Sequence, residues 1–289
     1  MSELRNSSEP MAKGPAEAPP VYLDARRELA ARYLFGEGVE IGPLHQPLAM
    51  PPGVKVSYID RLKVADLRRE YPELAEWNLT EADILDDGEL LTTIEPASQD
   101  FIVANHFLEH CEDPIGTIEN HLGKLRPGGI LFYAVPDKRF TFDYPRDVTP
   151  LEHMIADYEQ GPEASRSAHF DDWARLVEYK LDEPPEQTVA RARDLERAGH
   201  SIHMHVWTQA EFLQLILAAR QRFGDVFEIE AAARQQIEFV IVLRKNGPLP
   251  APHAEMVAAT PAPAPSPPLA TVTQRARSAL RRISGAARG

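Results

Sequence analysis

Short apolar runs recur along the chain and predict the strands of a sheet. Continuous or β-branched apolar stretches occur at residues 39–41, 54–59, 101–104, 130–135, 226–231 and 237–243, and a weaker one lies at 78–82. The early runs lack alternating polar positions, as expected for strands that are buried on both faces. The pattern therefore predicts a sheet of seven strands.

Longer amphipathic stretches separate these runs and predict helices. Asp24 offers an N-cap for a helix over 25–35, a second helix over 62–71 ends before Pro72, and a short one covers 89–94. Asp113 and Pro114 begin a helix that runs to about Leu125, where Arg126-Pro-Gly-Gly129 breaks it. A capping box from Thr208 to Glu211 opens a helix to about Arg222.

The alternation of strand and helix predicts an α/β fold with helices on both faces of a mostly parallel sheet. Only about five residues separate the last two predicted strands. Because a parallel crossover needs about a dozen residues or more, we expect the last strand to be antiparallel.

The two ends of the chain differ in composition from its middle. Residues 1–20 are polar and proline-bearing and predict a disordered arm, whereas 21–245 predict one domain in which 137–205 is an insertion without strand signals. Residues 246–289 are a Pro/Ala-rich linker and a tail with five arginines. The tail is either a basic amphipathic helix, which would make a peripheral membrane contact, or a frayed cationic end.

Charge and cysteine content narrow the classes of function. The formal net charge of −13 over 289 residues disfavours nucleic acid as a partner. Cys111 is the single cysteine, so no intramolecular disulfide is expected, and it is best interpreted as a small buried residue. The sequence has no apolar run of about 18 residues and no apolar signal core, and a cytoplasmic protein is expected.

Polar or small residues follow the apolar strands in order. They are Glu40 and Gly42, Asp60, Asp83, Asn105 and His106, and Pro136 and Asp137. Ligands of open α/β sheets bind at these carboxyl ends. Asp60 lies 20 residues after Glu40, the spacing at which an acid meets ribose hydroxyls. The series predicts a nucleoside-bearing ligand, with Asp83 near the base and Gly42 allowing close approach.

The loop after Gly42 argues against a dinucleotide. It contains Pro43, Pro47, Pro51 and Pro52, it has no G-x-G-x-x-G pattern, and its 11 residues before Val54 leave no room for a long helix. A pyrophosphate is normally bound at a helix N-terminus, which a ligand without phosphate does not need.

Five segments carry a resemblance to a known family. They are Val39-Glu-Ile-Gly42, Tyr58-Ile-Asp60, Glu81-Ala-Asp-Ile84, Asp100-Phe-Ile-Val-Ala-Asn-His-Phe-Leu-Glu-His110 and Leu125-Arg-Pro-Gly-Gly129. The chain resembles the class I S-adenosylmethionine-dependent methyltransferases of the type 11-like group. The resemblance covers residues 36–136, and 206–244 by topology alone.

The resemblance implies a Rossmann-like methyltransferase fold with S-adenosyl-L-methionine as cofactor. Glu40 and Gly42 would line its methionine end, Asp60 would hold the ribose, and Arg61 beside it joins the cofactor-binding set. Asp83 and Ile84 would flank the adenine, and Asn105 would face the amino-acid portion through its backbone. The first loop departs from the family because its second and third glycines are missing.

Methyl transfer requires an aligned acceptor and often a base that removes its proton. His106 and His110 lie one helical turn apart, on one face of an expected helix, and are the candidate catalytic bases. Their alternative role is to cap that helix or to pack under the insertion.

The insertion follows strand five, where this family often recognises its acceptor, and it is expected to bind the acceptor or act as a lid. Candidates for acceptor contacts are Asp137, Lys138, Arg139, His153, His169, His203 and His205. His203 and His205 would share one face of a strand and suggest a metal. No third ligand stands at a fixed spacing, so no metal is expected.

The sequence thus predicts a methyltransferase that acts on a hydroxyl of a small molecule or glycan. Two alternatives stay open. The chain is a non-catalytic binding or regulatory protein if the loop prolines block the cofactor, or a nicotinamide-dependent oxidoreductase, against which the missing glycines count.

Overall fold

The computed structural model describes residues 22–74, 76–178 and 184–248. Within them a seven-stranded sheet has the order β3-β2-β1-β4-β5-β7-β6. Its strands are β1 (Glu37–Ile41), β2 (Lys55–Asp60), β3 (Ile84–Leu85), β4 (Gln99–Asn105), β5 (Leu125–Pro136), β6 (Phe227–Gln235) and β7 (Glu238–Lys245). β7 is antiparallel to both of its neighbours, β5 and β6, whereas the pairs among β1 to β5 are parallel. The predicted sheet and its antiparallel last strand are confirmed.

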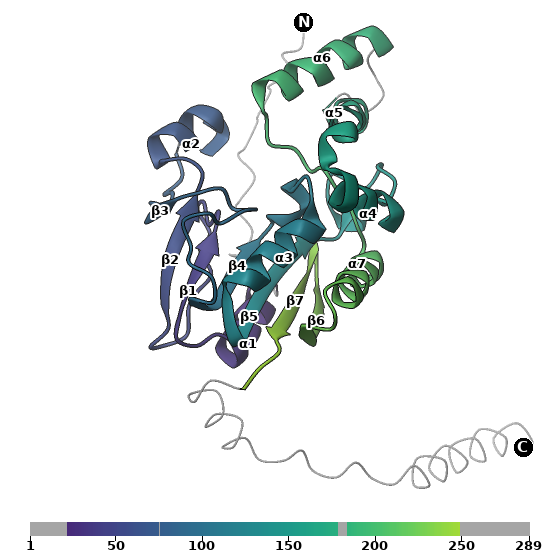
Figure 1. Ribbon diagram of the computed structural model, residues 1–289. Coiled ribbons are helices and arrows are strands. Elements are labelled where there is room, and N and C mark those ends of the chain that lie inside the picture. Colours follow the sequence, from purple (N-terminus) through teal and green to yellow (C-terminus); the bar gives the residue numbers. More distant parts are fainter. Residues whose placement is uncertain (1–21, 75, 179–183, 249–289) are drawn as a thin grey trace, which may run out of the picture. The chain divides into compact units, whose positions relative to one another are not determined.

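Helices lie on both faces of this sheet (Figure 1). They are α1 (Tyr22–Tyr33), α2 (Val64–Glu70), α3 (Pro114–Lys124), α4 (Leu151–Gln160), α5 (Arg166–Trp173), α6 (Pro185–Ala198) and α7 (Gln209–Arg222). None of these described helices is long and apolar enough to cross a membrane. The amphipathic tail and the N-terminal arm predicted from the sequence lie outside the described residues.

Alternate residues of the central strand β4 belong to two separate cores. Phe101 and Val103 pack with Ala30 and Leu34, which lie in and just after α1, on one face of the sheet. Ile102 and Ala104 pack with α3 and α7 on the other face. All four β4 side chains are fully buried. This explains why residues 101–104 of the strand include no polar side chain and why both sheet faces need helices.

The insertion forms its own small core beside the sheet. Phe170, Ala174, Ala192, Leu195, Ile202 and Met204 make up this cluster. The chain leaves the sheet after β5 and returns beside the same strand, where Asp137 pairs with Trp207 in an isolated parallel bridge. The insertion is therefore attached at the carboxyl end of β5, and its described residues form helices and loops rather than strands of the sheet.

Two predicted elements near the third strand were wrong. The strand lies at Ile84–Leu85 rather than 78–82, because these residues pair with Ile59 and Asp60 of β2. Residues 89–94 form turns rather than a helix. The Asp87 side chain accepts the Glu89 and Leu90 N–H groups as an N-cap would, but the Asp86 side chain accepts the Thr93 N–H, which a helix would direct to the Glu89 carbonyl.

Three boundaries also differ from the prediction. α1 begins at Tyr22, so Asp24 lies inside the helix and does not cap it. The Arg126-Pro-Gly-Gly129 segment belongs to β5, where the pairing with β4 jumps from Leu125 to Ile130. The turn between β6 and β7 has two residues rather than five, and Gln236 adopts a positive φ of 36° there.

Candidate active site

A cavity of about 370 Å³ opens at the carboxyl ends of β1 and β4. It is lined by Arg26, Glu40, Gly42, Pro43, Leu44, His45, Gln46, Asn105, His106, Ile237 and Glu238. Its volume lies in the range of sites that hold small molecules or cofactors. Four residues predicted from the strand ends, Glu40, Gly42, Asn105 and His106, meet here.

Glu40 anchors the first loop beneath this cavity. Its side chain is buried, and both carboxylate oxygens accept the Leu48 N–H, at 2.9 and 3.0 Å. Burial raises the pKa of Glu40 to about 7, although the Leu48 bond and the charge of Arg26 oppose this rise. The loop therefore turns back onto the strand that precedes it, without the helix that a dinucleotide site would provide.

Gly42 leaves space for a ligand. It has a φ of +59°, and an added Cβ would meet no atom within 4 Å. A left-handed conformation of this kind favours glycine. The prolines of the first loop thus do not close the space above Gly42.

Asn105 ends β4 with an unsatisfied side chain. The amide approaches Glu40 closely enough to lower the pKa of that carboxyl, but neither the oxygen nor the nitrogen of this buried carboxamide has a hydrogen-bond partner of ordinary geometry within the described ranges. A buried polar group left unpaired costs roughly 1–3 kcal/mol. Because this amide lines the cavity, a polar ligand there would remove the cost.

Asp60 lies at the end of β2, next to the first loop. Its Oδ1 accepts the Leu62 N–H at 3.0 Å, and burial raises its pKa. Gly42 N donates to Ile59 O at 2.8 Å, so the ends of β1 and β2 are adjacent. Arg61 instead forms an ion pair with Glu70 of α2.

The expectation that Asp83 ends the third strand was wrong. Asp83 precedes β3, and its Oδ2 accepts the Tyr58 N–H at 2.8 Å. Ile84 follows within β3, in register with Ile59. Asp86 is the acid at the carboxyl end of β3, where bonds from Thr93, Thr92 and Asp87 outweigh burial and lower its pKa. Asp86 therefore organises its own loop.

His106 and His110 do not share a helical face. His106 has a φ of +51°, and only a 3-10 turn, Leu108–His110, follows it. His106 Nε2 donates to Glu238 Oε2 over 2.7 Å, and Glu238 also accepts the Arg26 Nε–H at 2.7 Å. Burial disfavours protonated His106, but the Glu238 bond and the charge of Glu109 raise its pKa overall. Glu238 thus holds the His106 imidazole at the cavity wall.

His110 lies in a different environment, under the insertion. Its Nδ1 lies 2.9 Å from Ile202 O and 3.0 Å from Ser201 Oγ. Burial lowers the pKa of His110 to about 3, so the ring is neutral. It is not among the residues that line the cavity.

Sequence reasoning missed Arg26 and Glu238. They are 212 positions apart and meet only because α1 packs against β7 at the turn after β6. One signal was available: Glu238 is an acid that opens a strongly apolar run directly after a turn.

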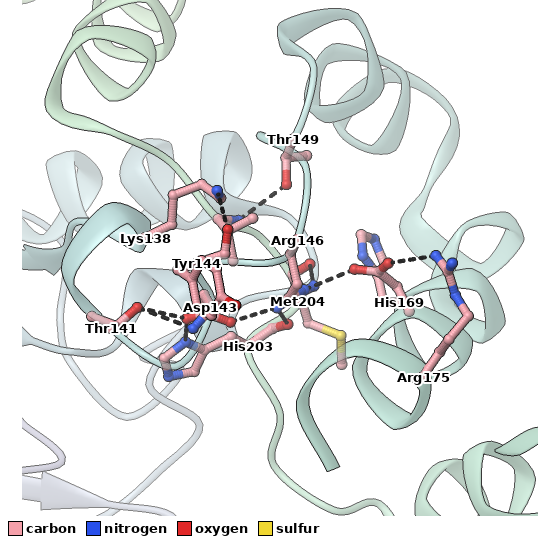
Figure 2. A network of polar contacts seen from close by, with 12 residues as sticks. Lys138, Thr141, Asp143, Tyr144, Arg146, Thr149, His169, Arg175, His203 and Met204 are labelled. Atoms are coloured by element: carbon pink, nitrogen blue, oxygen red, sulfur yellow. Dashed lines mark hydrogen bonds and ion pairs between the residues drawn. The ribbon is translucent and has the colours of Figure 1, made fainter. Parts of the chain in front are cut away.

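The other polar candidates of the insertion contact their own loop. Asp137 accepts the Arg139 Nε–H at 2.9 Å, and Lys138 Nζ donates to Tyr144 O at 3.0 Å. Figure 2 shows this loop beside His203, whose Nδ1 donates to Asp143 Oδ2 over 2.6 Å. Arg146 lies at the centre of the same network.

Comparison with solved structures finds distant similarities. A methyltransferase from Aquifex aeolicus is 12% identical with a TM-score of 0.42, covering 78% of this chain and 94% of that one. One from Listeria monocytogenes is 12% identical with a TM-score of 0.43, covering 78% and 97%. The methyltransferase in complex with the Haloferax volcanii Trm112 activator is 12% identical with a TM-score of 0.45, covering 78% and 89%.

The sequence identifies the family to which the chain belongs. No curated protein matches it. Residues 41–219, more than half of the chain, match the family described as a methyltransferase domain, and this span includes both strand ends that form the cavity floor. The chain therefore belongs to the family of methyltransferase domains, of class I architecture.

Proposed function

We propose that this chain transfers a methyl group from S-adenosyl-L-methionine to a hydroxyl group of a small molecule or glycan, with His106 as the general base. The family implies the cofactor. The choice of a hydroxyl acceptor rests on one observation, the hydrogen bond between His106 and Glu238 at the cavity wall. A hydroxyl must lose a proton as it is methylated, and a paired imidazole is suited to accept it.

The residues at the strand ends fit the cofactor. The open space above Gly42 and the unpaired amide of Asn105 suit its amino-acid end, and the buried carboxylate of Asp60 suits the ribose hydroxyls. Ile84 would flank the adenine. When bound, the cofactor supplies an electrophilic methyl group on a sulfonium, which is a good leaving group.

His106 is oriented for proton transfer by the groups around it. Its Nε2–H is held by Glu238, so Nδ1, which lies 3.5 Å from Glu109 Oε1, is the nitrogen left to accept a proton. Glu238 would stabilise the imidazolium that forms, and Arg26 fixes the position of Glu238. His110, neutral and bonded to the insertion, is better suited to positioning the segment than to acting as the base.

The two alternatives are less well supported. A nicotinamide-dependent oxidoreductase does not agree with the family. A non-catalytic protein was expected to have its site closed by the loop prolines, yet the space above Gly42 is open.

Cofactor binding is tested first by calorimetric titration of the full chain. S-adenosylmethionine and S-adenosylhomocysteine should both bind, and Asp60→Ala should weaken both because it removes the ribose acceptor. The matched control is Asp194→Ala, which removes an exposed carboxylate on α6. Absence of binding by folded wild-type protein would overturn the enzyme assignment.

The acceptor is tested by a matched screen. Sugars and small alcohols are compared with their amine analogues, and formation of S-adenosylhomocysteine and of a C–O–CH₃ linkage are both measured. Loss of the base in His106→Gln should slow turnover by about 10²–10⁴-fold while cofactor binding is kept. His200→Gln, at the end of α6, is the control. Methylation of amines alone, or an unchanged rate in His106→Gln, would refute the proposal.

A further inference from the structure

Three histidines from separate parts of the insertion converge on one point. His153 lies on α4, His169 on α5, and His205 just before Trp207. One ring nitrogen of each lies within 4.8 Å of those of the other two. His153 Nε2 and His169 Nε2 are only 3.0 Å apart. Three imidazoles this close together need either a bound group that all three contact or an arrangement of N–H groups in which one ring nitrogen donates to the next.

Two buried atoms around this point have no hydrogen-bond partner in the part of the chain that the structure describes. They are His205 Nδ1 and Asp157 Oδ2, on side chains that are 0% and 4% exposed as residues. Asp157 Oδ2 also lies 3.1 Å from His153 Nε2. Each unpaired atom would carry a desolvation cost of roughly 1–3 kcal/mol, so both point to a group that binds here.

The atoms that face away from this point are anchored. His205 Nε2 donates to Glu112 O over 3.2 Å, which leaves Nδ1 as the nitrogen with the lone pair. The His169 ring bonds to the backbone of Met204. The other oxygen of Asp157 accepts the Ser165 hydroxyl at 2.8 Å. Metal-binding imidazoles typically donate their second N–H to a backbone carbonyl in this way.

We propose that His153, His169 and His205 bind a zinc ion, with Asp157 as the fourth ligand. Zinc prefers imidazole and carboxylate ligands in a tetrahedron, with bonds of about 2.0–2.2 Å, which places ligand atoms roughly 3.3 Å apart. The observed separations of 3.0 Å and 3.1 Å around His153 Nε2 approach this value.

The burial of the ligands indicates a structural site. His205, Asp157 and His169 are 0%, 4% and 8% exposed, which leaves little access for a substrate or water. A closed four-ligand site contributes to folding, whereas a catalytic zinc keeps an open position. The ion would join α4, α5 and the segment that returns to the sheet at Trp207.

Arg146 supports this arrangement by binding the segment that leads to His205, and Figure 2 shows it beside His203 and Met204. Its guanidinium donates to His203 O at 2.8 Å and to Met204 O at 3.2 Å, and it binds Asp172 of α5 at 2.8 Å. These bonds fix the backbone directly before the His205 ligand whether or not a metal is bound. Such preorganisation by surrounding groups is what a well-formed metal site requires.

A neighbouring cluster provides the alternative location. Glu109, His110 and His203 also have donor atoms within 4.8 Å of one another. Both Glu109 oxygens are also buried without a hydrogen-bond partner among the described residues, but this cluster offers three ligands, whereas Asp157 adds a fourth to the three histidines. The three-histidine cluster is therefore the better site, and the experiment must separate the two.

The test uses the full chain, stripped of metal with a chelator and titrated with Co²⁺ or Zn²⁺. We expect one ion per chain by mass spectrometry and the visible absorption of tetrahedral Co²⁺. His153→Gln, whose side chain is 31% exposed, and His169→Gln should each lower metal affinity by at least about tenfold. His200→Gln should bind as the wild type does. The melting temperature should rise with Zn²⁺ only in the wild type and this control.

Two results would overturn the proposal. Folded wild-type protein could bind no Co²⁺, in which case the imidazoles are held by hydrogen bonds alone. Alternatively, binding could persist in both ligand variants and disappear in His110→Gln, which would place the ion in the neighbouring cluster. If a ligand variant fails to fold, anomalous diffraction from Zn²⁺-soaked wild-type crystals locates the ion directly. None of these readouts depends on methyltransferase activity.

Discussion

His106 Nε2 lies 2.7 Å from Glu238 Oε2, although the two residues are 132 positions apart. The contact exists because β7 runs antiparallel between β5 and β6, which brings its first residue to the carboxyl end of the sheet. There it meets the residue that follows β4. The reversed last strand thus contributes a buried acid to a site otherwise built from parallel strand ends.

This contact predicts how His106 titrates. Because the Glu238 carboxylate raises the pKa of His106, Glu238→Gln should lower that pKa. The titration is followed by NMR on the His106 ring proton, assigned by its loss in His106→Gln. The control is Glu228→Gln on β6, an exposed acid paired with Arg220, which should leave the midpoint unchanged. Equal midpoints in Glu238→Gln and the wild type would contradict the prediction.

The same contact has a defined effect on stability. His106 has a raised pKa in the folded state, so the stability that its contact with Glu238 contributes is fully present below the ordinary histidine pKa of 6.5. This stability is lost as the pH rises through the pKa that His106 has in the folded protein. Glu238→Gln should therefore destabilise the protein more at pH 6 than at pH 9, as measured by urea unfolding.

Glu40 should make the folded protein less stable as the pH rises, because its pKa is raised; a carboxyl group with a lowered pKa has the opposite effect. Burial raises its pKa from 4.5 to about 7, so the folded state holds a proton that the unfolded state releases between these values. The free energy of unfolding should fall by roughly 3 kcal/mol over this range relative to Glu40→Gln. Glu37→Gln alters an exposed side chain of the same strand, and its free energy of unfolding should vary with pH as that of the wild type does. Parallel stability curves for wild type and Glu40→Gln would refute this.

Gly42 and Gly199 form a matched pair for testing the cofactor site. Their φ angles are +59° and +62°, and an added Cβ would meet no atom within 4 Å at either. Gly42→Ala and Gly199→Ala should each cost about 1–2 kcal/mol of stability, because alanine resists a left-handed conformation. Only Gly42→Ala should weaken S-adenosylhomocysteine binding, since its methyl group would enter the cavity. Equal affinity in both variants, measured by calorimetry, would remove Gly42 from the site.

Most of the helices and strands could be predicted from residues that are close together in the sequence. The capping box predicted at Thr208 and Glu211 is present, and the Asp113 side chain accepts the Gly116 N–H as an N-cap should. Such features depend on residues three or four apart. The third strand was misplaced because its two residues become a strand only by pairing with Ile59 and Asp60.

The site was harder to predict than the fold. Strand ends identified Glu40, Gly42, Asn105 and His106, because parallel strands end at one edge of the sheet. Nothing local marks Arg26 as a partner of Glu238. The spacing of His203 and His205 suggested a pair, but the further members of each cluster come from other elements, and sequence spacing carries no record of that packing.

Arg146 should be a major determinant of the stability of the insertion. Its side chain is 2% exposed and binds Asp143 at 3.0 Å as well as Asp172 at 2.8 Å. Arg146→Ala would leave the Asp143 carboxylate buried with one partner fewer and two backbone carbonyls unpaired. Removing one member of a buried ion pair costs about 3–5 kcal/mol.

Two further variants define what Arg146 contributes. Arg146→Lys should recover little of the loss, because a single ammonium cannot reproduce the planar set of donors that reaches His203 O and Met204 O together. Arg175→Ala removes an arginine that is 56% exposed and lies 3.3 Å from Asp172, so it should cost no more than about 1 kcal/mol. Urea unfolding at pH 7 measures all three variants. If Arg146→Ala lost no more stability than Arg175→Ala, the network around Arg146 would not hold the insertion in place.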